Sequence, residues 1–593
     1  MCGIVGYIGS SNARNIIIEG LEKLEYRGYD SAGITLYNLS SNLFNIYKDI
    51  GRVSTLSKTT HNILSNIGIG HTRWATHGKV NAVNAHPHQS SSGRYIIVHN
   101  GVIENFKQLK NQYLKNHTFI SETDTEVIAH LIDSFSTIMD VEKSIVSTLN
   151  LLQGSYALLI IDNKDPNTIY AAKNKPPLII GKDEEGVTIT SDILALAGYA
   201  KTYHVLADKT FVVSQKDSVK LYDYDLNEIQ VQFEEFNFDI KSSEKGIFEH
   251  FMLKEIHEQP TVIRRIMKGY IHDSSININQ SLLNDLKQSS RIYILAAGTS
   301  MHAGIVGKKI IEDLIKKPVE VHIASEFAYN TPLIDPNAFF ILISQSGETA
   351  DLRTCLTKLK KQDYKTLTIT NVITSTLARE SLYALEIFAG PEIAVASTKA
   401  YVAQIAMLFI LAYALSDKAI DIQYELSKTA QAMENFLLSD SHIRDLVVKY
   451  INTKHAFYIG RGMDYATSLE AALKLKEISY IHTEGFAAGE LKHGTIALIE
   501  DKTPVIAIIS HESINLNTRS NLEETVSRGA IPIVITLESL KSDGDDIILE
   551  DVHPLLTPIL TILPAQLIAY YASYELGYDI DKPRNLAKSV TVE

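Results

Sequence analysis

The second residue of this chain, Cys2, combines a reactive side chain with an unusual position. Removal of Met1, which is common before a small residue, would give Cys2 a free α-amino group. Such an amine has a pKa of about 7.7 to 8 and can act as a base close to neutral pH. A thiol beside this base is an activated nucleophile, by the logic of an N-terminal threonine. Taken alone, a cysteine at this place is more often a small buried residue.

Groups that suit a small zwitterion follow downstream of Cys2. Arg73, in GHTRWATHG, can hold a carboxylate through two parallel hydrogen bonds, and Asp124, in SETDTE, could take an ammonium group. Asn100 and Gly101, in VHNGVIEN, offer a side-chain amide and a backbone N–H, the donors that a tetrahedral oxyanion needs. Each motif alone has an ordinary explanation, because Thr-His and Asn-Gly are typical of turns and SETDTE is typical of a helix N-cap.

Five sequence blocks place these residues in one context: MCGIVGYIG, LEYRGYDSAG, GHTRWATHG, HNG and SETDTE. In order and spacing, the blocks resemble the glutaminase domain of the N-terminal-nucleophile amidotransferases, across residues 2–235. The resemblance implies that Cys2 attacks the side-chain amide of glutamine, forms a glutamyl thioester and releases ammonia. A sheltered path for the ammonia is then needed, because ammonia is protonated in neutral water and is no longer a nucleophile.

The same resemblance implies a role for each candidate residue. Arg73 would bind the glutamine carboxylate, and Asp124 would bind its amino group. Asn100 and Gly101 would form the oxyanion hole, and Thr76 and His77 would line the pocket. Arg27 would support the loop beside Cys2, and Trp74 would lie on the path that ammonia takes.

A second group of candidate residues suits a phosphate. In ILISQSGETAD an apolar strand ends at Ser344, and a helix is predicted to start near Thr349. Hydroxyl groups, free backbone N–H groups and a helix N-terminus together suit an anion, although no Gly-Lys-Ser/Thr of a nucleotide-binding loop follows. AAGTS, ending at Ser300, adds hydroxyls after a neighbouring strand. Ligands of open α/β sheets bind at the carboxyl ends of strands, so two such loops favour a phosphate site over a pair of serine caps.

Three further side chains have ordinary explanations when each is considered alone. Lys474 and Glu477 are three residues apart and share a helix face, as solvated ion pairs often do. His493, in GELKHG, is typical of a loop histidine, and Lys588, in DKPRNLAKSVTVE, is typical of a solvated tail.

Five sequence blocks change the ordinary explanations of these three features: SQSGET, PEIAVASTKA, ALKLKE, GELKHG and DKPRNLAKSVTVE. They resemble the sugar-isomerase (SIS) half of the glucosamine-6-phosphate synthase family, from residue 250 to residue 593. The resemblance implies the conversion of fructose 6-phosphate and glutamine to glucosamine 6-phosphate and glutamate. The chemistry requires no metal and no cofactor, because a lysine imine makes C2 electrophilic and a carboxylate can move the proton.

The resemblance also implies the isomerase roles. Lys588 forms the Schiff base at C2, Glu477 moves the proton between C1 and C2, Lys474 supports that step, and His493 opens the sugar ring from a neighbouring subunit, which implies a homodimer. The sugar phosphate would contact Thr299, Ser300, Ser344, Gln345, Ser346, Thr349, Val395, Ser397 and Ala587.

The elements that would position these residues differ between the two halves. Short β-branched runs without regular helices between them predict stacked antiparallel sheets in the first half, with helices over residues 12–24 and from about Thr125. Strands alternate with long helices after about residue 240, which predicts parallel sheets. Three positions recur later in the chain at nearly the same spacing: Gly298 recurs as Gly462, Ser344 as Ser510 and Thr370 as Thr536. This recurrence indicates a duplicated α/β unit.

The predicted architecture is therefore an α+β N-terminal-nucleophile glutaminase domain followed by two α/β SIS subdomains with parallel sheets. We expect the glutaminase domain over residues 1–240, the first SIS subdomain, which binds the sugar phosphate, over 241–425, and the second, with the catalytic tail, over 426–593. The second copy has ISHES in place of the Gln-Ser-Gly loop, so only the first copy is expected to bind sugar phosphate through this loop.

Composition excludes several classes of protein. With 21% charged and 45% hydrophobic residues, the chain is typical of globular proteins, and its net charge of −13 argues against a nucleic-acid or anionic-membrane partner. Two cysteines cannot build a disulfide framework or a cysteine-rich zinc site. The N-terminus lacks a signal-peptide pattern, and the apolar windows 400–415 and 555–571 fall short of the roughly 18 to 20 clean apolar residues of a spanning helix. We therefore expect a cytoplasmic protein.

Two alternatives remain at this stage. A phosphoribosyl amidotransferase would share the glutaminase but would carry an acidic pyrophosphate-binding run after a strand, and SQSGET argues against it. A sugar-phosphate sensor built from SIS domains would not need Cys2, Glu477 and Lys588 together, yet all three are present.

Overall fold

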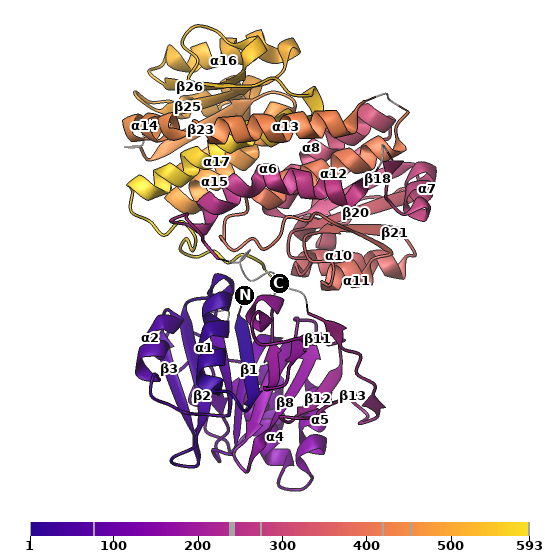
Figure 1. The fold of residues 1–593 in the computed structure, drawn as a ribbon, viewed down its shortest axis with the longest axis vertical. Coiled ribbons are helices and arrows are strands. Elements are labelled where there is room, and N and C mark those ends of the chain that lie inside the picture. The colour runs from indigo at the N-terminus through magenta and orange to yellow at the C-terminus, as the bar shows by residue number, and fades with distance from the viewer. Residues whose placement is uncertain are drawn as a thin grey trace. The chain divides into compact units, whose positions relative to one another are not determined.

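The computed structural model describes residues 2–74, 78–236, 244–272, 275–417, 420–450 and 453–590. The chain forms two compact units, one of residues Met1–Ser242 with Ser589–Glu593, and one of residues Ser243–Lys588 (Figure 1).

Two antiparallel sheets form the centre of the first unit. Within the described residues, one sheet has eight strands in the order β15 (Glu234–Glu235), β11 (Thr202–Val205), β9 (Ile179–Lys182), β10 (Gly186–Thr190), β1 (Gly3–Gly9), β4 (Ile67–Arg73), β2 (Ser31–Asn38) and β3 (Leu43–Ile50). The other has seven strands in the order β14 (Glu228–Ile229), β13 (Val219–Tyr222), β12 (Thr210–Ser214), β8 (Asp165–Asn174), β7 (Gly154–Asp162), β6 (Tyr95–Ile103) and β5 (His88–Gln89).

Alternating side chains of β1 show how the layers of this unit pack. Ile4 and Ile8 contribute to the core between the two sheets, whereas Val5 and Tyr7 contribute to the core beneath the helices on the outer side. This alternation is the period of two that a strand buried on both faces requires. Helices cover both outer faces, so the unit has four layers: α1 (Ala13–Leu24) and α2 (Val53–Thr59) on one side, and α3 (Phe106–Tyr113), α4 (Glu126–Phe135) and α5 (Val141–Leu151) on the other (Figure 1).

The antiparallel sheets and the helices at residues 12–24 and near Thr125 were predicted correctly. Sequence reasoning missed α2, α3 and α5. The start of α5 carried a local signal, because the side chain of Asp140 accepts a hydrogen bond from the backbone N–H of Lys143, which is an N-cap.

Two parallel five-stranded sheets organise the second unit, as predicted. Within the described residues, the first has the order β19 (Val319–Ile323), β18 (Arg291–Ala296), β20 (Ala338–Ser344), β21 (Lys365–Thr370) and β22 (Tyr383–Glu386). The second has the order β24 (His482–Ala487), β23 (His455–Gly460), β25 (Pro504–Ile509), β26 (Ile531–Leu537) and β27 (Ile547–Leu549). The identical strand orders confirm the duplication that the echoed residues indicated.

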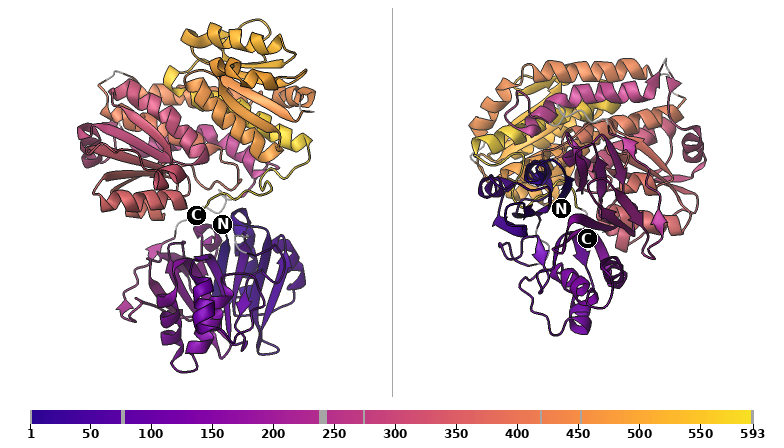
Figure 2. Two further views of the ribbon diagram at one scale, coloured as in Figure 1. Left: turned by 180° about the vertical axis from the view of Figure 1, so that it is seen from behind. Right: turned by 60° about the horizontal axis from the view of Figure 1, so that its bottom comes forward.

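Helices cover both sheets, and the longest of them lie between the sheets in the views of Figures 1 and 2. One continuous apolar core joins the helices between the sheets to both sheets, and a smaller, separate core lies on the other face of the first sheet. The helices of the unit are α6 (Phe251–Tyr270), α7 (Gln280–Gln288), α8 (Gly298–Ile315), α9 (Ala324–Tyr329), α10 (Ala350–Lys361), α11 (Thr376–Glu380), α12 (Lys399–Leu415), α13 (Ile422–Leu437), α14 (Ser441–Tyr450), α15 (Met463–Ser479), α16 (Asn515–Val526) and α17 (Thr557–Glu575).

The helical stretch Pro554–Glu575 is long and apolar enough to cross a membrane by length and composition, contrary to the sequence estimate for this window. Burial decides its role, because 94% of its most apolar window lies inside the protein. The stretch is therefore a core helix of the second unit.

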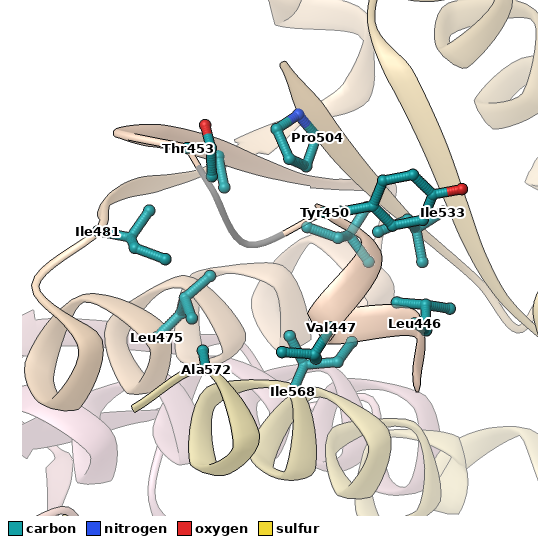
Figure 3. Close-up of a pocket in the computed structure, with 12 residues that line it drawn as sticks. Leu446, Val447, Tyr450, Thr453, Leu475, Ile481, Pro504, Ile533, Ile568 and Ala572 are labelled. Atoms are coloured by element: carbon teal, nitrogen blue, oxygen red, sulfur yellow. The ribbon is translucent and has the colours of Figure 1, made fainter. Parts of the chain in front are cut away.

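A small apolar cavity of about 40 Å³ lies against this helix, which contributes Ile568 and Ala572 to its lining (Figure 3). Leu446 and Val447 of α14, Leu475 of α15, and Ile568 and Ala572 of α17 are among its lining residues, none of which is charged. The cavity is partly open to solvent and has no charged group among its lining residues.

Candidate active sites

Cys2 lies directly before β1 and is half-buried. Its Sγ accepts a hydrogen bond from the backbone N–H of Trp74 at 3.2 Å and lies 3.5 Å from the Trp74 carbonyl oxygen. Burial raises the pKa of the Cys2 thiol, and the positive charges of Arg73 and Arg27 oppose this shift. A neighbouring base is therefore needed to make the thiol reactive at neutral pH.

Gly3 brings the backbone after Cys2 against the adjacent elements. Its N–H donates to Thr72 Oγ1 at 3.1 Å. A Cβ at this position would lie 2.6 Å from Thr72 Oγ1 and 2.8 Å from Leu24 Cβ, so no larger residue fits without displacing them.

Of the two predicted oxyanion donors, both on β6, Asn100 contacts the residue predicted to be the nucleophile. Asn100 donates its Nδ2–H to the carbonyl oxygen of Cys2 at 2.9 Å, which places the amide beside the reactive residue. Gly101 adopts a φ of +135°, and a Cβ there would lie 2.0 Å from the carbonyl oxygen of Ser155. Only glycine fits at this position.

Arg73 and Asp124 are both buried beside this site. The Arg73 guanidinium donates to the carbonyl oxygens of Gly78 and Lys79 at 3.3 Å each. Burial lowers the pKa of Arg73, and the charges of Cys2, Asp30 and Asp124 act against that shift, which indicates that these groups share one region. Asp124 Oδ2 accepts from the Ile103 N–H at 2.7 Å, and Thr125, not Asp124, occupies the N-cap position of α4.

The remaining glutaminase candidates differ in how far the structure describes them. Arg27 is buried and pairs with Asp192, which also accepts from the Tyr26 hydroxyl at 2.5 Å. The Trp74 ring meets the Tyr29 ring edge-on at 5.9 Å. Thr76 and His77 lie outside the described residues.

Four buried histidines beneath this site were not predicted. His71 stacks on His86 at 4.1 Å, and His86 also lies against His88 and His99. His86 Nδ1 accepts from the His99 backbone N–H at 3.1 Å, directly before Asn100. Burial lowers the pKa of His71 to about 3 and lowers those of His86 and His88, so these three rings are neutral near pH 7.

The predicted phosphate residues gather at the carboxyl ends of β18 and β20. Thr299 and Ser300 lie in the first turn of α8, and Thr349 occupies the N-cap position of α10. Ser344 Oγ lies 2.9 Å from Thr349 Oγ1 and accepts from the Gly347 N–H at 3.0 Å. Gln345 and Ser346 complete the loop, and the Glu348 N–H donates to Ser346 Oγ at 3.2 Å. Two helix N-termini and several hydroxyls suit a phosphate.

The second copy has a carboxylate at the corresponding place. Asp464, in the first turn of α15, is fully buried. Its Oδ2 accepts from the Ser510 backbone N–H at 2.9 Å, and its Oδ1 accepts from the Ser510 hydroxyl. By the echo of Gly298 at Gly462, Asp464 is the counterpart of Ser300. In the second copy the carboxylate of Asp464 therefore lies at the strand end where the first copy has hydroxyl groups.

Lys474 and Glu477 form a mostly buried pair and not a solvated one. Lys474 Nζ lies 2.6 Å from Glu477 Oε2 and 3.5 Å from Glu470 Oε1, and it donates to Thr299 Oγ1 at 3.1 Å. Burial lowers the pKa of Lys474, but the charges of Glu477, Glu470 and Glu392 outweigh it and raise the pKa overall.

Lys588 is buried although it lies near the end of the chain. Its Nζ donates to Glu392 Oε2 at 2.6 Å and to the Ala394 carbonyl oxygen at 2.9 Å. Burial acts to raise the pKa of Glu392, but Lys588 and the backbone N–H groups of Ala400 and Thr398 hold it at about 2. The pair places an amine beside the loop that carries Val395.

The other sugar-site candidates flank this pair or lie apart from it. Ser397 Oγ donates to Glu392 Oε2 at 2.9 Å, and the Val395 N–H donates to the Asp581 carbonyl oxygen at 2.9 Å. Ala587 directly precedes Lys588 and is half-buried. His493 ends the 3-10 helix Ala488–His493 and is exposed.

Sequence reasoning missed two buried carboxylates of this site. Glu392 lies inside the matched block PEIAVASTKA, and Glu470 lies one helical turn before Lys474, so the nearby sequence carried a signal for both.

In the glutaminase half, Asp192 is the partner of Arg27. The nearby sequence carried no signal for Asp192, because only the fold brings it next to Arg27.

Family models match both halves of the chain. A glutamine amidotransferase domain matches residues 57–222, and an SIS domain matches residues 285–414 and 449–576.

Curated relatives match the chain from end to end. The chain is 52% identical to the glutamine–fructose-6-phosphate aminotransferase (isomerizing) of Listeria innocua and 50% identical to that of Staphylococcus aureus, each over 603 aligned residues that cover 100% of both chains. The solved C-terminal domain of the glucosamine-fructose-6-phosphate aminotransferase of Francisella tularensis is 35% identical, with a TM-score of 0.53, and covers 57% of this chain and 100% of its own. The chain belongs to the glutamine–fructose-6-phosphate aminotransferase (isomerizing) family.

Proposed function

We propose that this chain converts fructose 6-phosphate and glutamine to glucosamine 6-phosphate and glutamate, a step of hexosamine biosynthesis. The burial of Lys588 against Glu392 carries the isomerase half of the proposal, because a lysine near the chain end has no packing reason to be 3% exposed. The contact of Asn100 with Cys2 supports the glutaminase half.

In the first half, Cys2 attacks the side-chain amide of glutamine after removal of Met1. The α-amine takes the thiol proton, Asn100 and Gly101 stabilise the oxyanion, and the amide nitrogen leaves as ammonia. Water then hydrolyses the thioester to release glutamate. Arg73 and Asp124 hold the two charged groups of glutamine, Thr76 and His77 line the pocket, Arg27 supports the loop, and Trp74 lies on the ammonia path.

In the second half, Lys588 condenses with the C2 carbonyl of the open sugar, and water leaves. Ammonia displaces the lysine from C2. Glu477, supported by Lys474, removes a proton from C1 to form an enolamine, and return of a proton to C2 gives the aldehyde at C1 and the amine at C2. Thr299, Ser300, Ser344, Gln345, Ser346 and Thr349 hold the phosphate, and Val395, Ser397 and Ala587 contact the sugar.

The assembly and the domain bounds belong to the same proposal. His493 opens the sugar ring in the site of a second copy, so the active enzyme is a homodimer; the exposure of His493 supports this role. The glutaminase domain spans residues 1–240, and the SIS subdomains span residues 241–425 and 426–593. We propose that the enzyme acts in the cytoplasm.

Replacement of the nucleophile tests the proposal. Cys2→Ala is expected to lower glutamine-dependent synthesis of the amino sugar phosphate by at least about a thousandfold. Synthesis from free ammonia should remain, because the isomerase half is unchanged. Cys355→Ala is the matched control, since Cys355 is buried in α10 with its Sγ 3.3 Å from the Ala324 carbonyl oxygen. Retention of glutamine-dependent synthesis by Cys2→Ala would show that the thiol assignment is wrong.

A further inference from the structure

His302 connects the helix of the phosphate residues to the helix of the proposed base. It lies on α8, one turn after Thr299, and its Nδ1 is 2.7 Å from Glu470 Oε2 on α15. The His302 side chain is 14% exposed, and the Glu470 side chain is 0% exposed. Since a carboxylate can only accept, the geometry requires the proton on Nδ1.

Glu470 divides its two oxygens between different partners. Oε2 accepts from His302, whereas Oε1 accepts from the Thr299 hydroxyl at 3.0 Å and lies 3.5 Å from Lys474 Nζ. A fully buried carboxylate is costly unless each oxygen is satisfied. The donor from His302 therefore reduces the demand of Glu470 on the nearby ammonium.

Lys474 is the cation for which two carboxylates compete. It lies 2.6 Å from Glu477 and 3.5 Å from Glu470, so the present arrangement favours Glu477. Further ionisable groups that act here include Glu392, whose charge acts on Lys474, and Tyr401 of α12, on which the charge of Glu470 acts. No other cation within the described residues lies within ion-pair distance of Glu477.

We propose that His302 is a positioning residue: by donating to Glu470, it leaves Lys474 bonded to Glu477 and so holds the carboxylate of that base in position for the proton transfer. This inference rests on the proposed role of Glu477. Without the histidine donor, Lys474 moves toward Glu470. Glu477, which is 20% exposed, then loses its cation. The carboxylate can then adopt other rotamers, so it is less often aimed at the C1 proton.

The test compares two variants in the full-length enzyme, with ammonia as nitrogen donor so that the glutaminase half does not contribute. His302→Leu removes the donor, and its kcat should fall at least about tenfold while its KM for fructose 6-phosphate stays near the wild-type value. His302→Gln keeps an N–H donor, and its kcat should stay close to that of the wild type. His322→Leu is the matched control, because His322 forms a similar contact with Glu320, at 3.1 Å, on β19.

The outcomes separate this inference from the function on which it rests. If kcat of His302→Leu is unchanged, or if its KM rises as much as its kcat falls, or if His302→Gln is as slow as His302→Leu, the positioning role is absent and the inference is wrong. Glu477→Gln should abolish the ammonia-dependent reaction. If Glu477→Gln stays active, the base assignment fails, and the inference fails with it.

Discussion

At the scale of single residues, Glu392 organises much of the proposed sugar site. Its Oε2 accepts from Lys588 and Ser397, and its Oε1 accepts from the backbone N–H groups of Thr398 and Ala400. One buried carboxylate thus shapes the loop before α12 and fixes the position of the amine.

Removal of this charge should be costly. Glu392→Gln leaves the Lys588 ammonium buried without its anion, so we expect the free energy of unfolding of the second unit to fall by about 3 kcal/mol. Denaturant titration measures the change. The double variant Glu392→Gln with Lys588→Met should recover part of the loss, and a neutral single variant would contradict this role for Glu392.

At the scale of elements, the two SIS copies place different groups at the same strand end. The central strand β20 ends at Ser344, and Ser510 directly follows the central strand β25. In both copies a glycine of positive φ lies at the start of a helix: Gly298, at +54°, is the first residue of α8, and Gly462, at +58°, directly precedes α15. The copies then differ, because Asp464 fills the position that corresponds to Ser300.

Transfer of that carboxylate to the first copy tests the equivalence. Ser300→Asp should repel the sugar phosphate and raise the KM for fructose 6-phosphate at least about tenfold, which corresponds to about 1.4 kcal/mol. Glutaminase activity should not change. Ser300→Asn is the uncharged control of the same size, and an unchanged KM for Ser300→Asp would show that the copies do not correspond at this position.

The local sequence pattern predicted the elements well where the hydrophobic periodicity agrees with the residues that mark turns and helix ends. Residues close in sequence predict three of these elements: the strand and loop around Ser344, the helix that carries Lys474, and the strand from Ile4 to Ile8. Contacts between distant segments could not be predicted, since nothing near Arg27 points to Asp192 and nothing in the tail points to the Lys588–Glu392 pair. The roles of both residues came from family resemblance, and their partners came from the fold.

At the scale of the whole molecule, the buried histidines of the first unit make its stability depend on pH. His71 titrates near pH 3 when folded and near its ordinary value of about 6.5 when unfolded. Between these values the unfolded state binds more protons, so stability falls as the pH drops below about 6.5. The lowered pKa values of His86 and His88 act in the same direction.

Fluorescence of Trp74 can follow this unit selectively, because it is the single tryptophan of the chain. The unfolding midpoint by this signal should fall steadily from pH 7 to pH 5, and His71→Gln should show a shallower slope. A midpoint that stays constant over this range would contradict the assignment of neutral buried histidines.

The Schiff base at Lys588 is the central claim, because it alone distinguishes a catalytic tail from a buried ion pair. Borohydride reduction of the enzyme with fructose 6-phosphate, followed by peptide mass spectrometry, tests it directly. We predict a reduced sugar phosphate adduct on Lys588, and no adduct on a Lys588→Arg variant. An adduct on another lysine, or none on the active enzyme, would contradict the proposed mechanism.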